Sequence, residues 1–138
     1  MWPKEEIPND AAVFMRLPRK LIPNNEVGPN VFREHGGGMS VDWSKYSTPD
    51  ETRKRARKSR PEDNAVIGMV AGDIRTIDGL EVEHDPVQEN SFDESGVPLD
   101  PNRAHSEVLG ISSDSAEKKT ERRLKLSRIW RWEIRLEI

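Results

Sequence analysis

Apolar residues form one continuous run in this chain, and elsewhere they mostly alternate with polar residues. The run is Ala65–Ala71, and an uninterrupted apolar segment of this length is typical of a strand covered on both faces. Asp78 and Gly79 predict a turn after it. Leu80–His84 then alternates, which predicts a second strand with one face toward solvent. We therefore expect these two strands to form the central pair of the fold.

Four other segments are predicted to be strands: Ala11–Leu17, Met39–Trp43, Arg103–Ile111 and Trp130–Ile138. Strict alternation in the second and the last of them predicts one buried face for each. In the third, His105 and Glu107 are expected on one face and Ser106 and Val108 on the other. The stripe of Trp130 and Trp132 fits either the core or an interface with another chain.

Two surface helices are also predicted. Thr48 can cap a helix whose first position is Pro49, and Glu51 completes a capping box. This helix should run to about Lys58, and it is so highly charged that it must lie at the surface. A second helix is expected to begin at Asp114.

The predicted fold is therefore α+β, a single domain with a mixed or mainly antiparallel sheet of about six strands and two surface helices. The length of 138 residues suits one domain. Residues 1–10 are expected to be a loosely held polar arm. Residues 11–138 should form the domain, with an acidic surface loop at about 87–102.

The composition limits the classes of function that are open to this chain. Charged residues make up 34% of the chain, yet the net charge is only −3, so no overall field favours nucleic acid or a membrane. The absence of cysteine excludes disulfide and thiolate chemistry. Without a long apolar segment or a signal-peptide pattern, we expect a soluble cytoplasmic protein with no membrane partner.

One group of polar residues could form a binding or catalytic site. If the predicted strands share a sheet, Arg16, Arg19, Ser40 and His105 can line one face or rim of it. Arginine offers a planar donor fork for phosphate or carboxylate, and His105 can transfer a proton near neutral pH. Ser40 and His105 are therefore the candidate catalytic residues, with Arg16 and Arg19 as candidate ligand-binding residues.

The ligand-binding candidates also include His35, Gly37, Gly38 and Arg103. Consecutive glycines can bring backbone N–H groups to an anion, although a glycine triplet is less specific than a complete phosphate loop. The alternative is structural: Arg16 and His105 would join a hydrogen-bond network, and the glycines would form a turn. The three histidines have no short ligand spacing, so neither a metal site nor a cofactor is predicted.

Two segments, Arg53–Arg60 and Lys118–Arg128, each carry six basic residues. Such segments can follow a phosphate backbone, but no aromatic residues are interleaved in the first for base stacking. A protein partner with an acidic surface, or the protein's own acidic loop, explains the first segment equally well. Nucleic acid is thus a partner that the sequence allows but does not favour.

Five short segments carry a resemblance: Arg16-x-Pro18, Phe32, Gly38-Met39-Ser40-Val41, Asn102-Arg103-Ala104-His105 and Arg123-Leu124-Lys125-Leu126-Ser127. With them the chain resembles, from Val13 to Ile134, a family of short bacterial proteins of uncharacterised function. Its layout is also similar to ADP-ribosyl-transferring folds and RNA 2′-phosphotransferases. This similarity implies an NAD-like nucleotide or an RNA end as ligand, but their acidic catalytic residue and aromatic clamp have no evident counterpart here.

Without a recognisable catalytic motif, we expect a non-enzymatic binding or interaction module with a protein partner. One alternative is an enzyme or ligand-binding domain that acts on a phosphorylated small molecule or an RNA end. The other is nucleic-acid binding through the basic helices.

Overall fold

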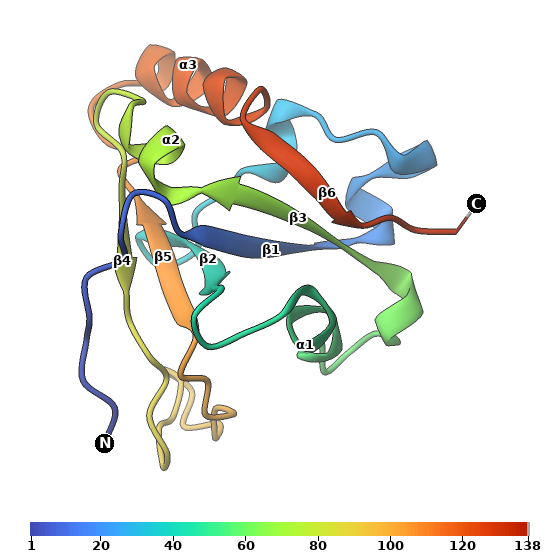
Figure 1. Ribbon diagram of the computed structural model, residues 1–138, viewed down its shortest axis with the longest axis vertical. Coiled ribbons are helices and arrows are strands. Elements are labelled where there is room, and N and C mark those ends of the chain that lie inside the picture. The colour runs from blue at the N-terminus through green and yellow to red at the C-terminus, as the bar shows by residue number, and fades with distance from the viewer. Residues whose placement is uncertain (138) are drawn as a thin grey trace.

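The computed structural model describes residues 1–137 and confirms the predicted α+β class (Figure 1). Six strands form one sheet in the order β4-β5-β2-β1-β3-β6, and every neighbouring pair is antiparallel. The strands are β1 Ala12–Pro18, β2 Gly38–Trp43, β3 Asn64–Val70, β4 Glu81–His84, β5 His105–Leu109 and β6 Trp130–Ile134. The helices are α1 Pro49–Lys54, α2 Ala71–Arg75 and α3 Ala116–Leu126.

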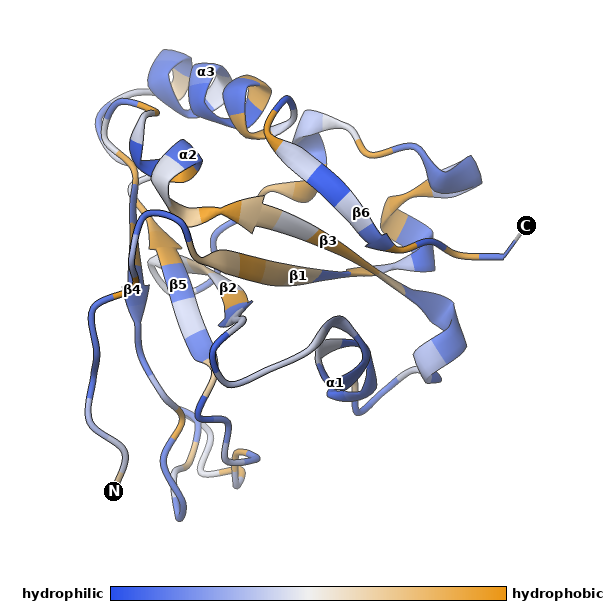
Figure 2. Cartoon of the chain, viewed as in Figure 1, coloured by the Kyte–Doolittle hydropathy of each residue, from blue (hydrophilic) through white to orange (hydrophobic). Residues whose placement is uncertain are grey.

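The core lies on one face of the sheet. Alternate residues of β1 and β3, such as Val13 and Ile67, point into it, and Figure 2 shows these two strands as the most hydrophobic part of the sheet. The segment after β1, with Phe32, and helix α3, with Leu126, cover this face. Helix α1 packs against β1 and β3 and contributes no apolar side chain to the core cluster. β3 is buried on both faces, as its apolar run predicts.

The expected pairing of the apolar run with the next strand is wrong. β3 lies between β1 and β6, whereas β4 is the strand at the opposite edge of the sheet. The chain leaves β3 through helix α2, which the sequence did not predict. The backbone of Asn9 accepts a hydrogen bond of 2.8 Å from Gly72 N, and a Cβ on Gly72 would lie 2.8 Å from the same oxygen. This contact holds the first turn of α2 against the N-terminal arm.

Within residues 1–137 the structure has three α-helices instead of the predicted two helices, and it changes the limits of those two. α1 begins as predicted, because the Thr48 side chain accepts a hydrogen bond from Glu51 N, but it ends at Lys54 and not at Lys58. α3 is capped by Ser115, whose hydroxyl accepts a hydrogen bond from Lys118 N. Asp114, the expected cap, instead adopts a φ of +74° just before the helix.

The N-terminal arm is held more firmly than its composition suggests. Ile7 is buried, Glu5 N donates a 3.0 Å hydrogen bond to His84 Nδ1, and Trp2 N donates one of 2.8 Å to Gln88. The arm therefore follows β4 along the edge of the sheet (Figure 1).

The C-terminal strand is shorter than predicted, since β6 ends at Ile134. Trp130 and Trp132 are half-buried and pack edge to face against each other and against the core. Leu136 is also buried, and its backbone hydrogen-bonds the Asn25 side chain. Among the helices described for residues 1–137, none is both long and apolar enough to cross a membrane.

Candidate functional site

Ser40 and His105 meet on the face of the sheet opposite the core. Ser40 lies on β2 and His105 on β5, and Ser40 Oγ is 3.2 Å from His105 Nε2. His105 Nδ1 lies 2.8 Å from the backbone oxygen of Asp85. A carbonyl can only accept, so Nδ1 carries the hydrogen, and Nε2 of the neutral ring accepts from the Ser40 hydroxyl. The result is a serine–histidine pair oriented by a backbone carbonyl.

This pair lies on an open surface. The two hollows described for residues 1–137 are lined by other residues, so neither places a cavity above Ser40 and His105. Catalytic pairs of this kind normally work in a concave site that excludes water. The geometry thus provides a nucleophile beside a base, outside both of these hollows.

Arg16 and Arg19 differ in their surroundings near this pair. Arg16 lies on β1 with an exposed side chain; partial desolvation lowers the pKa of its guanidinium, and the nearby charge of Asp42 partly opposes that shift. Arg19 binds Asp63 at 3.3 Å and the backbone oxygens of Glu62 and Glu137. Those partners belong to the segment before β3 and to the C-terminal end, both of which lie away from β2 in Figure 1.

The glycine run forms a tight turn that leads into β2. His35 N donates a 2.9 Å hydrogen bond to Gly38 O, and Gly36 and Gly37 adopt φ values of +65° and +96°. Both conformations favour glycine. Gly38 has a different role, because a Cβ there would lie 2.7 Å from Glu107 Oε2. Its missing side chain leaves room for the Glu107 carboxylate on the sheet.

The three histidines do not share one site. His84 is buried on the core face: its Nδ1 accepts from Glu5 N, so its Nε2 donates to the Arg103 backbone oxygen at 2.6 Å. The Arg103 guanidinium itself stacks over the Tyr46 ring at 4.2 Å. His105 points to the opposite face of the sheet, and His35 lies at the glycine turn.

The first basic segment is largely neutralised by acidic groups of the protein itself. Arg57 Nε donates a 2.7 Å hydrogen bond to Asp100 of the acidic loop, and Arg55 Nε lies 3.3 Å from Asp42. Arg60 Nε lies 3.1 Å from Glu62. These contacts match the alternative that the segment binds the protein's own acidic loop.

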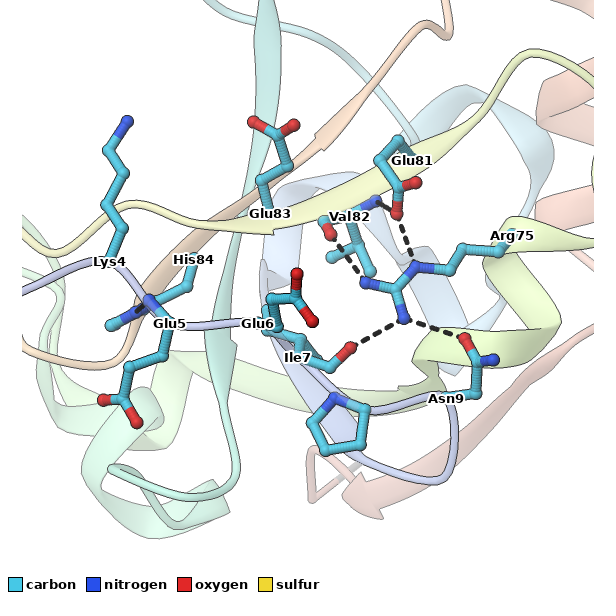
Figure 3. Close-up of a pocket in the computed structure, with 11 residues that line it drawn as sticks. Lys4, Glu5, Glu6, Ile7, Asn9, Arg75, Glu81, Val82, Glu83 and His84 are labelled. Atoms are coloured by element: carbon cyan, nitrogen blue, oxygen red, sulfur yellow. Dashed lines mark hydrogen bonds and ion pairs between the residues drawn. The ribbon is translucent and has the colours of Figure 1, made fainter.

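A groove of about 610 Å³ lies between the N-terminal arm and β4 (Figure 3). Its walls are formed by Lys4, Glu5, Glu6, Ile7, Pro8, Asn9, Arg75, Glu81, Val82, Glu83 and His84. Arg75 joins the two walls at one end. It donates hydrogen bonds to Ile7 O at 2.7 Å, to Asn9 Oδ1 at 2.8 Å and to Val82 O at 3.0 Å.

The groove carries an excess of negative charge. Glu5 is paired with Lys45, Glu81 with Arg75, and Lys4 with Asp85, so these charges largely cancel. Within residues 1–137, Glu6 and Glu83 form no ion pair, and both are exposed. The sequence did not identify this site, because the arm was expected to be loosely held. The acidic character of the segment that contains Glu83 was its only signal.

Acid should loosen the arm at Glu5. Hydrogen bonds from Lys45 and Tyr46 hold the pKa of Glu5 below its ordinary value of 4.5. A lowered pKa means that the stabilisation is complete above pH 4.5 and is lost as the pH falls through the folded-state pKa. We expect a carboxyl NMR titration of Glu5 to have its midpoint below 4.5. The hydrogen-exchange protection factors of residues 1–10 should fall over the same pH range, and Glu5→Gln should abolish this pH dependence. A midpoint at the ordinary value would contradict the prediction.

Comparison of the chain with models of protein families, with curated proteins and with solved structures found no match.

Proposed function

We propose that this protein is a binding module whose groove between the N-terminal arm and β4 receives an extended, basic segment of a partner protein. The observation that carries the proposal is a groove of about 610 Å³ with two unpaired carboxylates, Glu6 and Glu83, along the edge of a sheet. The volume is within the range of about 300–1,000 Å³ that is common for ligand sites.

The position of β4 favours an extended ligand. β4 is an edge strand, and such strands offer backbone groups to another chain. Asp85 N bonds His105 O, so the alternation of an antiparallel ladder directs the backbone groups of Val82 and His84 away from β5. The backbone groups of Val82 already have partners, since its oxygen accepts a hydrogen bond from Arg75 and its N–H donates one to Glu81. A ligand would therefore find its backbone partner at His84 and its charged partners at Glu6 and Glu83.

The charge of the groove favours a basic ligand over an acidic or phosphorylated one. A lysine or arginine side chain would neutralise Glu6 or Glu83, whereas a phosphate would face like charge. The side chains of Ile7 and Val82 are almost fully buried beneath the groove, so its exposed walls are mainly polar. A basic segment with small polar residues between its charges suits this combination.

The test is binding of a labelled eight-residue peptide of alternating lysine and threonine, measured by fluorescence anisotropy at low and at moderate salt. We expect saturable binding that weakens with salt, and Glu6→Lys should weaken it on the order of tenfold. The matched control is Glu26→Lys, which makes the same charge change at an exposed residue between β1 and β2, near the C-terminal segment.

A peptide with glutamate in place of lysine should not bind. Equal loss of binding in the Glu6→Lys and Glu26→Lys variants would show that net charge alone attracts the peptide. No binding of the lysine peptide at low salt would also reject the proposal.

A further inference from the structure

The geometry points to a site for a divalent transition-metal ion, with Zn²⁺ as the best match, formed by Asp85, His105 and Glu107. These residues lie on the face of the sheet opposite the core. A carboxylate oxygen of Asp85, a ring nitrogen of His105 and a carboxylate oxygen of Glu107 all lie within 4.8 Å of one another. This spacing brings two carboxylates and one imidazole close enough to converge on one ion.

The orientation of the imidazole sets this cluster apart from a surface patch of acidic groups. His105 Nδ1 donates to the Asp85 backbone oxygen at 2.8 Å, which leaves the lone pair on Nε2. Histidine ligands of metal ions are usually held in this way, by a carbonyl or carboxylate that accepts the other ring hydrogen. This lone pair points toward Ser40. The Ser40 hydroxyl donates a hydrogen bond to it, with Oγ 3.2 Å from Nε2. An ion would replace that hydroxyl.

The surrounding charges favour a cation. Glu83 and Glu107 are directly opposite each other on β4 and β5, an arrangement that is unfavourable for two like charges. Lys4, at 3.6 Å from Asp85, is the one cation paired with this group within residues 1–137. One exposed lysine does not neutralise these carboxylates. A divalent ion would reduce the repulsion between them.

The backbone leaves space for the third ligand. Glu107 Oε2 would lie 2.7 Å from a Cβ on Gly38, so only glycine at this position allows the carboxylate to lie flat on β2. The turn formed by Gly36 and Gly37 places Gly38 at the start of β2, beside β5. The glycine run thus makes room for a metal ligand, a role that its sequence did not indicate.

One nitrogen and two carboxylate ligands suit Zn²⁺ better than Mg²⁺ or Ca²⁺, which prefer sites made only of oxygen. Three protein ligands would leave a fourth tetrahedral position for water. The chain has no cysteine, so thiolates cannot compete for the ion. The inference concerns an ion site on the sheet and does not depend on the groove binding a partner.

The test is titration of the full chain with Zn²⁺ by calorimetry, and with Co²⁺ by visible absorption, which reports the coordination geometry. We expect one equivalent of bound ion. His105→Gln should weaken binding at least tenfold, and Asp85→Asn and Glu107→Gln should each weaken it clearly. The matched control is His35→Gln, which removes an exposed histidine outside the cluster and should leave the affinity unchanged. Ser40→Ala should retain binding, because the hydroxyl is displaced by the ion.

Circular dichroism of each variant would show whether a loss of binding is a loss of fold. No binding of Zn²⁺ by the folded wild-type chain would overturn the inference. Equal weakening by His35→Gln and His105→Gln would do the same, since it would indicate adventitious binding to surface histidines. Tighter binding of Mg²⁺ or Ca²⁺ that does not depend on His105 would also reject it.

Discussion

Replacing Arg122 by methionine is expected to lower the free energy of unfolding by about 3–5 kcal/mol. The Arg122 side chain is only 3% exposed, and it joins α3 to the turns before β4 and after β5. It donates to the backbone oxygens of Asp78, Gly110 and Ser113 at 2.8, 2.8 and 2.7 Å. Methionine fills similar space but leaves these carbonyls without their charged donor, and an unsatisfied buried acceptor is costly.

Urea denaturation followed by circular dichroism measures this effect. The control is Lys125→Met, which removes a lysine from the exposed side of the same helix; among residues 1–137 its one ion-pair partner is Glu121. Such surface pairs add little to stability, so this variant should unfold close to the wild type. If Arg122→Met were as stable as Lys125→Met, the packing of α3, and not the hydrogen bonds of Arg122, would hold this corner together.

Replacing Asp42 by alanine is expected to cost about 3 kcal/mol. The carboxylate is nearly buried on β2, where it accepts hydrogen bonds of 2.8 Å from Thr52 of α1 and from Asn102. Arg55 Nε lies 3.3 Å away, close enough for an ion pair although its angle is poor for a hydrogen bond. One acidic group therefore fixes both α1 and the end of the acidic loop to the sheet.

Thermal and urea unfolding of three variants would separate the contributions at this position. Asp42→Asn keeps an acceptor for Thr52 but removes the charge that faces Arg55, so its stability should lie between those of Asp42→Ala and the wild type. Asp100→Ala is the control, since it removes an exposed acidic residue that also pairs with an arginine of the segment following α1. It should change stability little. An equal loss of unfolding free energy in Asp42→Ala and Asp100→Ala would show that the buried contacts of Asp42 stabilise the protein no more than an exposed ion pair does.

The Ser40–His105 site shows which features of a site a local sequence pattern can predict. Period-two alternation places Ser40 on the solvent face of β2 and His105 on the same side of β5, so their contact follows once the two strands are neighbours. That the strands are neighbours is a non-local fact, which no local pattern specifies. Arg19 shows the converse, because its partners near β3 and at Glu137 draw it away from the pair that its residue type suggested.

The groove could not be predicted for the same reason. Its end is closed by Arg75, which contacts Ile7, a residue 68 positions away in the sequence. The composition of the arm predicts weak attachment, whereas its attachment depends on hydrogen bonds to His84 and Gln88. Contacts between residues so far apart in the sequence depend on the packing of the whole sheet. They produce little recognisable pattern in the sequence around the residues that form them.

The sequence alone determined the α+β class, the approximate positions of the six strands and the start of α1. These features follow from hydrophobic periodicity, capping residues and turn residues, which act over a few neighbouring positions. Only the tertiary structure decided the order of the strands, the short helix α2 after β3, the docking of the arm and the meeting of Asp85, His105 and Glu107. Each of these depends on contacts between distant segments, and such contacts form only when the packing of the whole chain favours them.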